Sequence, residues 1–409
     1  GLNYQIRISS SSRSWNSSSF EIVDSIIFKD YPQGEAEITM TYDELNKRIL
    51  LYNCMKGEMY FLDKGSNNWL GIPTVNNPTS RTECDITYIS DHNLVAMFGG
   101  NLDRKAFDDF WLFDIDSNTW NEVITDIRPQ ARTSSSIFYD RLNDQLILHG
   151  GLQGLTEANN NYYWGLDTWM YSFSTNSWQS SVWSINRKGP SSIASNAESI
   201  YMVVGGGLFK WTDAYWSEIT TNGQFEGWEQ SFAYIGSANK FILFMGRVSD
   251  TYLLDETTLQ WEKISTTDKP STRIPNKLIW DSYASMLLTY GGTEVDMGTN
   301  NRGKSLHDLW VFDAFAMNWI PVLRTPVIDG LNEQQTTNDN PFILNWKVVD
   351  DKIKSIAVYL DDKEIQSEKF VSGLGGVLSF STVFDLREGD NIIRIVVEDF
   401  DGNIIEELG

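Results

Sequence analysis

The sequence predicts an all-β chain, most of it a β-propeller of four-stranded blades, followed by a small β-sandwich. Three recurring marks support the propeller: a tryptophan that returns mostly every fifty to sixty residues, a glycine pair roughly twenty residues before it, and a Pro-x-x-Arg turn nine residues after it. A repeat of this length is typical of propeller blades. The marks run over residues 1 to about 322.

An apolar residue precedes each tryptophan by nine positions, which predicts a hairpin that closes each blade. The seven copies are Ile6/Trp15, Tyr60/Trp69, Trp111/Trp120, Trp169/Trp178, Ile219/Trp228, Tyr252/Trp261 and Trp310/Trp319. The first copy begins at its third strand, because no glycine pair comes before it. We therefore expect six full blades plus a partial seventh, and the seven tryptophans favour a seven-bladed ring. Missing upstream sequence or an N-terminal flap would account for the partial copy.

The glycine pairs follow apolar runs that are typical of buried strands. Four pairs are intact: Gly99/Gly100, Gly150/Gly151, Gly205/Gly206 and Gly291/Gly292. Glycine allows a backbone turn there that a side chain would block. The second strand of each blade should thus end at its glycine pair.

The Pro-x-x-Arg turns mark where an outer strand stops, since proline cannot continue a paired strand. They run from Pro78 to Arg81, from Pro129 to Arg132 and from Pro270 to Arg273. Pro190 and Pro32 are looser copies that lack the arginine at this spacing.

Together, the glycine pairs, the closing tryptophans and the Asp-x-Trp-x-Phe-Asp runs at Asp109 to Asp114 and Asp308 to Asp313 resemble the Kelch repeat. The resemblance covers residues 1–322 and implies a Kelch-type β-propeller, with blades around a channel and the first strand of each blade innermost. It also implies that the loops between second and third strands share a face with the Pro-x-x-Arg turns. Arg81, Arg132 and Arg273 would then ring the channel mouth.

The repeat marks stop after Trp319, and the rest of the chain is expected to be a separate module. We assign residues 323–340 as a linker, because Asn332 to Asn340 is a polar run that cannot form a core. Residues 341–409 show short alternating strands. The run Leu386 to Asn403 resembles bacterial immunoglobulin-like domains, which implies a β-sandwich in an extracellular or cell-surface protein.

Charge and composition exclude several classes of partner. The chain has 409 residues, with 32 Lys and Arg against 55 Asp and Glu, and a net charge of −23. Phosphate contact needs a basic face, so nucleic acid is not an expected partner. No apolar stretch approaches the roughly 18 residues of a membrane helix, so direct membrane insertion is not expected either.

The two cysteines occupy positions that a propeller could bring together. Cys54 ends a second strand, and Cys84 begins the first strand of the next blade. A disulfide between them would fit an oxidising compartment, whereas two buried thiols in neighbouring strands fit the spacing equally well. The sequence leaves both alternatives open.

Catalytic chemistry finds little support. The three histidines, His92, His149 and His307, sit beside strands in the repeat and read as structural, whereas copper or zinc sites usually need several converging imidazoles. No Gly-x-Ser-x-Gly elbow occurs, and turn chemistry explains most paired carboxylates. We therefore expect no catalytic residue, no cofactor and no metal, and predict that the chain is not an enzyme.

Two long loops between second and third strands carry the remaining candidate binding residues. The first, Leu152 to Leu166, contains Asn160, Tyr162, Tyr163 and Trp164, and the second, Thr293 to Leu306, contains Arg302. Aromatic rings beside amides suit the apolar face and hydroxyls of a sugar, and equally a protein hot spot. The alternative is that the aromatic residues simply pack over the neighbouring blade.

Arg81, Arg132 and Arg273 complete the candidate site, because an arginine ring in an acidic chain could hold a carboxylate. The alternative is that each arginine pairs with an acid of a neighbouring blade. The leading hypothesis is a non-catalytic extracellular or cell-surface recognition protein that binds a glycan or protein through the propeller's loop face. Two alternatives are an enzyme acting on a sugar or sugar acid, as Kelch-type sialic acid epimerases do, and a structural subunit of a surface assembly.

Overall fold

The computed structural model describes residues 7–9, 19–21, 38–63, 68–154, 162–181, 185–196, 198–212, 214–223, 225, 230–274, 277–295, 302–306, 308–314, 316–322, 327–329, 342–360, 363–384, 393–399 and 404–408. These residues form strands, turns and connections, with no helix among them. In particular, the described part of the chain has no helix that is long and apolar enough to cross a membrane.

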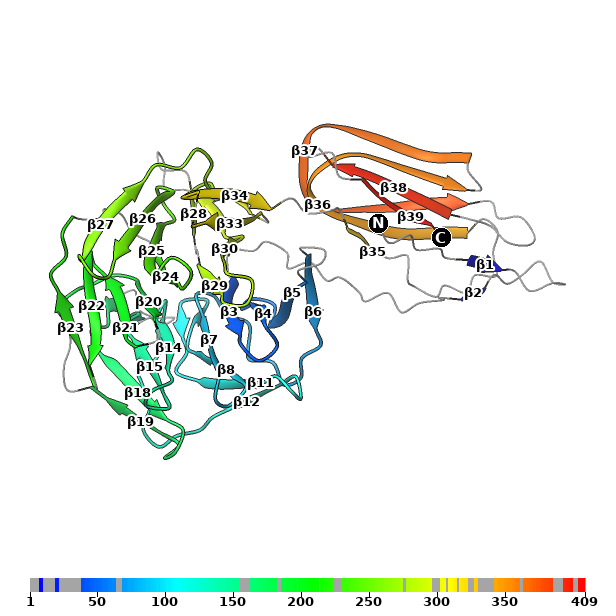
Figure 1. Ribbon diagram of the computed structural model, residues 1–409. Coiled ribbons are helices and arrows are strands. Elements are labelled where there is room, and N and C mark those ends of the chain that lie inside the picture. The colour runs from blue at the N-terminus through cyan, green and yellow to red at the C-terminus, as the bar shows by residue number, and fades with distance from the viewer. Residues whose placement is uncertain are drawn as a thin grey trace. The chain divides into compact units, whose positions relative to one another are not determined.

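Six four-stranded antiparallel sheets make up the larger part of the described chain (Figure 1). Sheet 1 contains β3 (Ile38–Asp43), β4 (Arg48–Asn53), β5 (Glu58–Asp63) and β6 (Asn68–Ile72); sheet 2 contains β7 (Asp85–Ile89), β8 (Leu94–Phe98), β11 (Phe110–Asp114) and β12 (Thr119–Glu122); sheet 3 contains β14 (Ser136–Asp140), β15 (Gln145–His149), β18 (Thr168–Ser172) and β19 (Ser177–Ser180). Sheet 4 contains β20 (Ser191–Ser195), β21 (Ile200–Val204), β22 (Gly207–Thr212) and β23 (Tyr215–Ile219); sheet 5 contains β24 (Gln230–Ile235), β25 (Lys240–Met245), β26 (Asp250–Asp255) and β27 (Gln260–Ile264); sheet 6 contains β29 (Ile279–Asp281), β30 (Met286–Tyr290), β33 (Leu309–Asp313) and β34 (Asn318–Val322).

The first strands of the six sheets form the inner wall of a ring. β3, β7, β14, β20, β24 and β29 are each in contact with the next, and β29 also contacts β3 (Figure 1). Every sheet is built from four strands in chain order, as expected for a propeller blade, with two short loop strands between the second and third strands in sheets 2, 3 and 6. This is an all-β arrangement with the strand order of a Kelch-type propeller.

The partial seventh blade has no counterpart among these six sheets. Among the described residues, β1 (Arg7–Ser9) pairs with β2 (Ser19–Glu21) as a two-stranded sheet, and Trp15 lies outside the described residues. The chain divides into two compact units, one of Gly34–Leu62 with Ile72–Val322 and the other of Gly1–Gln33, Asp63–Gly71 and Leu323–Gly409. The first 33 residues thus fall outside the unit that holds the ring, whereas the sequence assigned them to the propeller.

The prediction that Ile219/Trp228 forms a closing hairpin is wrong. Ile219 lies in β23, which is the fourth strand of sheet 4, and Trp216 faces Trp211 across the pair β22 and β23. Trp216 therefore takes the closing position, while Trp228 lies outside the described residues. A short turn between the third and fourth strands of this sheet removes the nine-residue spacing that holds elsewhere.

The closing tryptophans pack against the preceding sheet. Trp120 of sheet 2 packs 5.0 Å from the ring of Tyr52 in sheet 1, and Trp178 of sheet 3 packs 5.6 Å from Phe98 in sheet 2. Such aromatic pairs add roughly 0.5–1.5 kcal/mol to the burial of their surfaces. The recurring tryptophan therefore helps to hold neighbouring sheets together around the ring.

The predicted glycine turns are present at the ends of the second strands. Gly99, Gly150, Gly205 and Gly291 have φ between +53° and +68°, and their following glycines also have positive φ. At Gly99 a Cβ atom would lie 2.4 Å from the Arg132 carbonyl oxygen, so this position tolerates no side chain. Glycine therefore lets the next sheet approach closely at this end of the ring.

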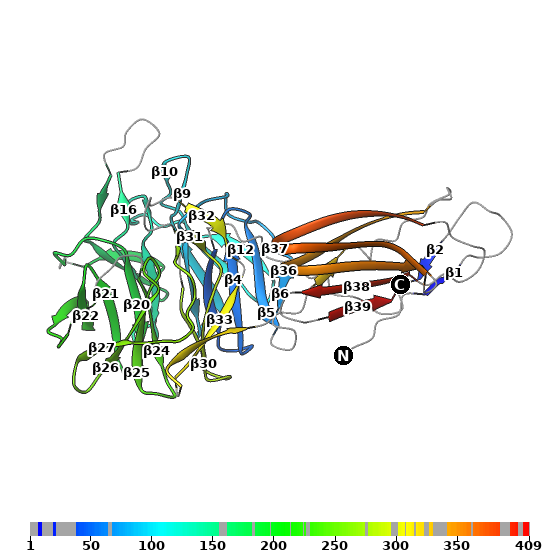
Figure 2. The same ribbon diagram turned by 90° about the horizontal axis from the view of Figure 1, so that it is seen from above.

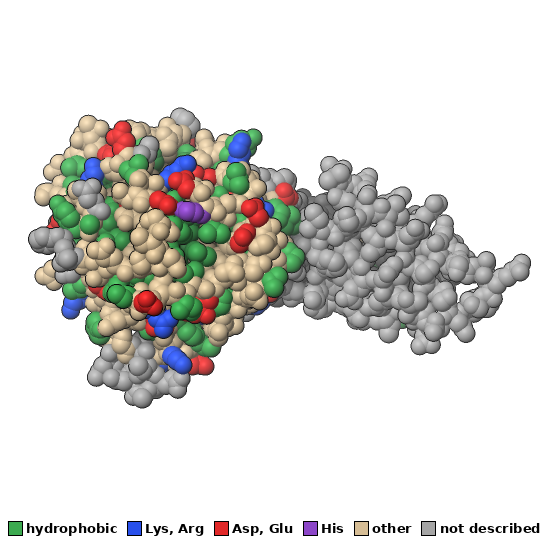
Figure 3. Space-filling view, turned by 90° about the horizontal axis from the view of Figure 1, so that it is seen from below, with side chains coloured by type: hydrophobic (Ala, Val, Ile, Leu, Met, Phe, Trp, Pro, Cys, Tyr) green, Lys and Arg blue, Asp and Glu red, His purple; other side chains and the backbone are tan. Residues whose placement is uncertain are grey.

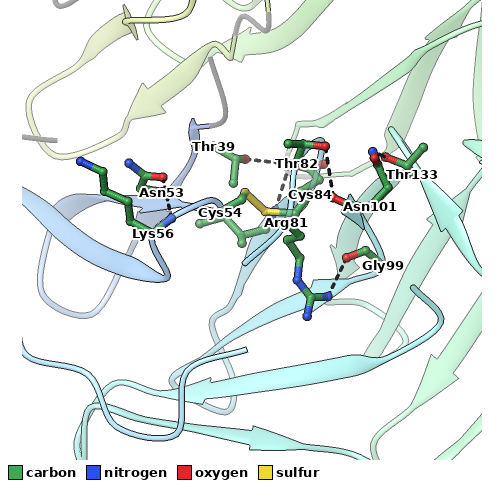
Figure 4. The surroundings of a disulfide bond; sticks show 12 residues. Thr39, Asn53, Cys54, Lys56, Arg81, Thr82, Cys84, Gly99, Asn101 and Thr133 are labelled. Atoms are coloured by element: carbon green, nitrogen blue, oxygen red, sulfur yellow. Dashed lines mark hydrogen bonds between the residues drawn. A yellow bond between two sulfur atoms is a disulfide. The ribbon is translucent and has the colours of Figure 1, made fainter. Parts of the chain in front are cut away.

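A disulfide joins sheets 1 and 2 (Figure 4). Cys54 follows β4, Cys84 precedes β7, and their Cα atoms lie 6.3 Å apart. Of the two alternatives left by the sequence, the structure contains the bonded pair.

The C-terminal part of the other unit forms an antiparallel sheet in the order β35 (Val327–Asp329), β36 (Phe342–Leu360), β38 (Ile393–Asp399) and β39 (Ile404–Leu408), with β37 (Lys363–Phe384) paired to β36. Register shifts between Asp350 and Ser355 divide β36 into two stretches. The earlier stretch pairs with β35 and the later one with β38. These strands agree with an all-β module, and the immunoglobulin-like sandwich stays a prediction.

Candidate functional site

Arg81 is held in a fully buried position at the end of sheet 2. Its Nη1 and Nη2 atoms donate to the two carboxylate oxygens of Asp109, at 2.7 and 2.8 Å. Nη1 also donates to the Gly99 carbonyl and Nε to the Thr79 carbonyl, at 2.8 and 2.9 Å (Figure 4 shows the Gly99 contact). The guanidinium therefore has a close partner for each of its three nitrogens, and its side chain has no exposed surface.

The same clamp recurs in sheets 3 and 6. Arg132 binds both oxygens of Asp167 and the Gly150 carbonyl, and Arg273 binds both oxygens of Asp308 and the Gly291 carbonyl. In each clamp the aspartate stands directly before the third strand and also accepts the indole N–H of a tryptophan two residues on. The Asp-x-Trp of the repeat and the arginine of the Pro-x-x-Arg turn are thus two halves of one structural contact.

Burial and the neighbouring positive charge shift the pKa of these aspartates in opposite directions. Burial alone would raise the pKa of Asp167, but the hydrogen bonds and positive charge of Arg132 and the Trp169 indole hold it below its ordinary value. The pKa of Asp308 is lowered in the same way, against its burial, by Arg273 and Trp310. Both carboxylates therefore stay ionised at neutral pH.

The clamps correct the expectation of a ring of accessible arginines. Arg81, Arg132 and Arg273 are fully buried, and their donors already face an aspartate and a backbone carbonyl. A carboxylate ligand would have to displace an internal aspartate that is already bidentate. Each arginine instead pairs with an internal acid, as the alternative interpretation expected. The acid comes from the sheet that begins just after the arginine.

A fourth copy of the clamp was missed by sequence reasoning. Arg187 donates to the Gly205 carbonyl at 3.1 Å and to Glu218 at 2.6 Å. Its side chain and that of Glu218 are 42% and 53% exposed. The signal that could have found it is a constant spacing of 18 residues from the arginine to the first glycine of the pair. Arg187 has this spacing, although it precedes Pro190 instead of following it.

Two aromatic residues of the first long loop, Tyr163 and Trp164, lie in a small three-stranded sheet, and Tyr162 directly precedes it. β16 (Leu152–Gln153) pairs with β17 (Tyr163–Trp164) and with β13 (Arg132–Thr133), which contains the clamped arginine. Tyr162 and Tyr163 are 56% and 54% exposed, and the Trp164 side chain is half-buried. The two tyrosines are therefore open to solvent beside or in this sheet, which the alternative of packing over the neighbouring blade does not describe.

Two of the predicted binding residues are not placed at the level of side chains. Asn160 lies outside the described residues. Arg302 begins β32 (Arg302–Ser305), which pairs with β31 (Thr293–Val295), and its side chain is likewise outside the described part.

The short hairpins of the second-to-third-strand loops share one face of the ring. Figure 2 shows β9 (Asn101–Leu102), β10 (Lys105–Ala106), β16 and β32 on the same side of the ring, away from β25 and β27. We call this side the loop face. As the Kelch resemblance implied, the Pro-x-x-Arg turns belong to it, because β13 and β28 (Arg273–Ile274) pair with loop strands.

A cavity of about 690 Å³ lies along the inner strands, and residues from all six sheets line it. Towards the loop face, the position four residues before the end of each inner strand is polar in every sheet. These six residues, which we call the mouth ring, are Thr39, Asp85, Ser136, Ser191, Ser231 and Lys277. Sequence reasoning missed the ring, because its members share neither residue type nor a local motif.

Side-chain hydrogen bonds connect the mouth ring. Asp85 Oδ1 accepts from Thr39 Oγ1 at 3.0 Å and from Lys277 Nζ at 2.7 Å. Ser191 Oγ donates to Ser136 Oγ at 2.9 Å, and Ser231 Oγ accepts from the Leu278 N–H. The ring thus links neighbouring inner strands and contains one carboxylate and one ammonium group.

The histidines that the structure describes have structural partners. His149 is fully buried, contacts Thr168 Oγ1 at 2.9 Å, and has its pKa lowered to about 4 by burial, with Arg132 adding to the shift and Asp167 opposing it. His92 binds Asp144 at 2.7 Å and stacks on Phe173. Among the described residues no three His, Cys, Asp or Glu side chains are grouped so that they could hold a metal ion.

Comparisons with known proteins agree with the architecture. Residues 51–246 match the family model of the KLHDC2/KLHL20/DRC7 Kelch-repeats domain. The solved structure of YjhT is similar with a TM-score of 0.56 at 12% sequence identity, covering 73% of this chain and 100% of that chain, which speaks for the fold alone. No curated protein matches the sequence. The matches support Kelch repeats arranged as a β-propeller.

Proposed function

We propose that the chain is a non-catalytic recognition protein that binds a partner through its loop face. The observation that carries the proposal is the pair Tyr162 and Tyr163, both more than half exposed, of which Tyr163 begins β17 in the β13, β16 and β17 sheet and Tyr162 directly precedes it. Tyrosine supplies a large contact area at low entropic cost and is common in binding hot spots. The buried Arg132–Asp167 clamp anchors the sheet, so the surface is ordered before binding.

Kelch domains generally act in protein–protein interaction, which favours a protein as the partner. A glycan is the second candidate, because exposed tyrosine rings also suit the apolar face of a sugar. Nucleic acid is disfavoured by the net charge of −23. On the side of the ring seen in Figure 3, basic side chains form no continuous stripe among the described residues.

We further propose an extracellular or cell-surface location, with the residues after 340 as an immunoglobulin-like spacer. The Cys54–Cys84 disulfide supports this location, since structural disulfides persist mainly in oxidising compartments. A surface assembly partner that completes the ring by strand addition is less favoured, because the six inner strands already neighbour one another around the ring.

The alternative of an enzyme acting on a sugar acid loses its main support in this geometry. It required Arg81, Arg132 and Arg273 to hold a substrate carboxylate, and all three are engaged with internal aspartates. The proposal of a recognition protein does not depend on those arginines.

The test is site-specific photocrosslinking in the native setting. Tyr163 is replaced by p-benzoylphenylalanine, and the matched control carries the same residue at Leu142, which is exposed in the β14–β15 turn of sheet 3, at the end of that sheet away from the loop face. Adducts at position 163 and none at 142 would support the loop face. Adducts at 142 alone would move the recognition surface to the other face and overturn the proposal. A glycan array with the unmodified chain and a Tyr162→Ala/Tyr163→Ala variant separates a sugar from a protein partner.

A further inference from the structure

We propose that the mouth ring binds a small neutral polyol of about monosaccharide size, with Asp85 and Lys277 as its principal contacts. This goes beyond the proposed function, because both the site and the ligand differ from the tyrosine surface of the loop face. The inference rests on the position of the ring, on the charge pair within it and on the size of the cavity behind it.

The mouth ring is polar at one position in every sheet, and its hydrogen bonds also link neighbouring inner strands. Its six residues occupy one register position on six inner strands, while Ile86, Ile137 and Leu278, which directly follow three of them, are buried apolar residues. Six polar side chains are thus gathered around the cavity from segments far apart in the sequence. A few convergent polar groups at a concave site are typical of small-molecule binding.

The charge pair joins two inner strands that are not neighbours in the ring. Asp85 belongs to β7 and Lys277 precedes β29, while β3 lies between these two strands around the ring. Both side chains keep contact with solvent, at 17% and 30% exposure. A partly buried ion pair gives little net stability compared with apolar residues. Stabilisation of the fold alone therefore does not explain why this pair is present.

The chemistry of this pair fits adjacent hydroxyl groups. Asp85 Oδ1 already accepts from Thr39, Lys277 and the Ile86 N–H, whereas Oδ2 has one long contact, 3.4 Å from the Ile137 N–H, and keeps acceptor capacity. Lys277 has three N–H donors, of which the contact with Asp85 uses one. Each hydroxyl of a vicinal diol can donate and accept, so a diol can donate to the carboxylate and accept from the ammonium group at once. Ser191, whose hydroxyl also lines the cavity, can add a further hydrogen bond.

Local charge disfavours an anionic ligand. Glu83 also lines the cavity and accepts from Thr133 Oγ1 and Ser134 Oγ at 2.9 and 2.6 Å. The mouth therefore carries two carboxylates against one ammonium group, in a chain of net charge −23. A neutral ligand avoids the repulsion that a carboxylate or phosphate would meet.

The cavity has the size that such a ligand requires. Its volume of about 690 Å³ falls within the usual range for small-molecule sites, roughly 300–1,000 Å³. Two residues further along three of the strands, Thr41, Thr87 and Phe138 also line the cavity. Hydroxyls and one aromatic ring are suitable neighbours for the polar edge and apolar face of a pyranose.

The test is isothermal titration of the intact chain with D-glucose, D-galactose, N-acetyl-D-glucosamine and myo-inositol, with D-glucuronate as the anionic control. We expect at least one neutral compound to bind and glucuronate to bind more weakly than glucose. Asp85→Asn and Lys277→Gln should each weaken that binding about tenfold or more, which corresponds to about 1.4 kcal/mol. Absence of binding by all four neutral compounds would overturn the inference.

Two control variants separate this site from the rest of the molecule. Lys240→Gln removes a lysine that pairs with Asp255 in sheet 5, away from the cavity, and is expected to leave binding unchanged. Tyr163→Ala should also leave it unchanged, while it weakens the partner of the loop face. If Asp85→Asn does not fold, Lys277→Gln and Ser191→Ala decide the question. Equal affinity in these variants and the unmodified chain would show that the pair only fastens the inner strands.

Discussion

Arg81 and Asp109 form a bidentate ion pair in which the guanidinium is entirely buried, with N–O distances of 2.7 and 2.8 Å. The backbone of Arg81 also reaches the preceding sheet, because its N–H donates to the Cys54 carbonyl. One residue therefore links sheet 1 to sheet 2 and closes the loop end of sheet 2. The three buried arginines, Arg81, Arg132 and Arg273, therefore hold the fold together, with their donors engaged inside the molecule.

We predict that Arg81→Met lowers the free energy of unfolding by about 3–5 kcal/mol, because it leaves the Asp109 carboxylate without its counter-charge. The matched control is Arg187→Met, which removes the exposed copy of the clamp and should cost less than about 1 kcal/mol. Urea denaturation of both variants gives the comparison. Similar losses in the two would refute a special role for the buried clamp.

Gly99→Ala should be more destabilising than Gly206→Ala. Both glycines have positive φ, so each substitution carries backbone strain of roughly 1–3 kcal/mol. At Gly99 the new Cβ would also overlap the Arg132 carbonyl oxygen at 2.4 Å, whereas no atom lies within 4 Å of it at Gly206. Thermal unfolding of the two variants measures the difference, and equal melting temperatures would contradict the close approach of sheets 2 and 3.

The Cys54–Cys84 disulfide should stabilise the ring at the junction of sheets 1 and 2. Substitution of both cysteines by serine is expected to lower the free energy of unfolding by about 2–4 kcal/mol, through a larger entropy of the unfolded chain. A thiol assay on the denatured, unreduced protein should find no free cysteine. Two titratable thiols in protein isolated without reductant would show that the bond is not formed.

His149 should make stability depend on pH. Its folded pKa of about 4 lies below the ordinary value of 6.5, chiefly because the buried site excludes the charged form. The unfolded chain therefore binds more protons between these values, so stability is intact above pH 6.5 and falls as pH drops towards 4, by up to roughly 3 kcal/mol. Unfolding free energies of His149→Gln across this range should lack that part of the slope. An identical slope would exclude His149 as its source.

Much of the architecture could be predicted because the repeat marks are local. The closing tryptophans, the glycine pairs and the Pro-x-x-Arg turns each report a contact made at a fixed offset in every sheet. The hairpin at Trp228 was predicted wrongly because a spacing match alone does not establish strand pairing, and the seventh copy stays a prediction, because Trp15 lies outside the described residues. In sheet 4 a shorter turn moved the closing position to Trp216.

The candidate site was less predictable because it depends on distant pairing. The partner of Arg81 lies 28 residues away and that of Arg132 lies 35 residues away, so only the folded sheet decides whether the guanidinium is free. The exposure of Tyr162 and Tyr163 also follows from the hairpin that carries them rather than from their neighbours in sequence. The mouth ring emerges only when the ends of all six inner strands are aligned.

The most direct test of the central claim is the affinity of the partner captured at Tyr163, measured for the unmodified chain and for Tyr162→Ala/Tyr163→Ala. Recognition through the loop face predicts at least a tenfold weaker complex, about 1.4 kcal/mol, with an unchanged free energy of unfolding, because both side chains are exposed. Equal affinity of the two proteins would contradict it.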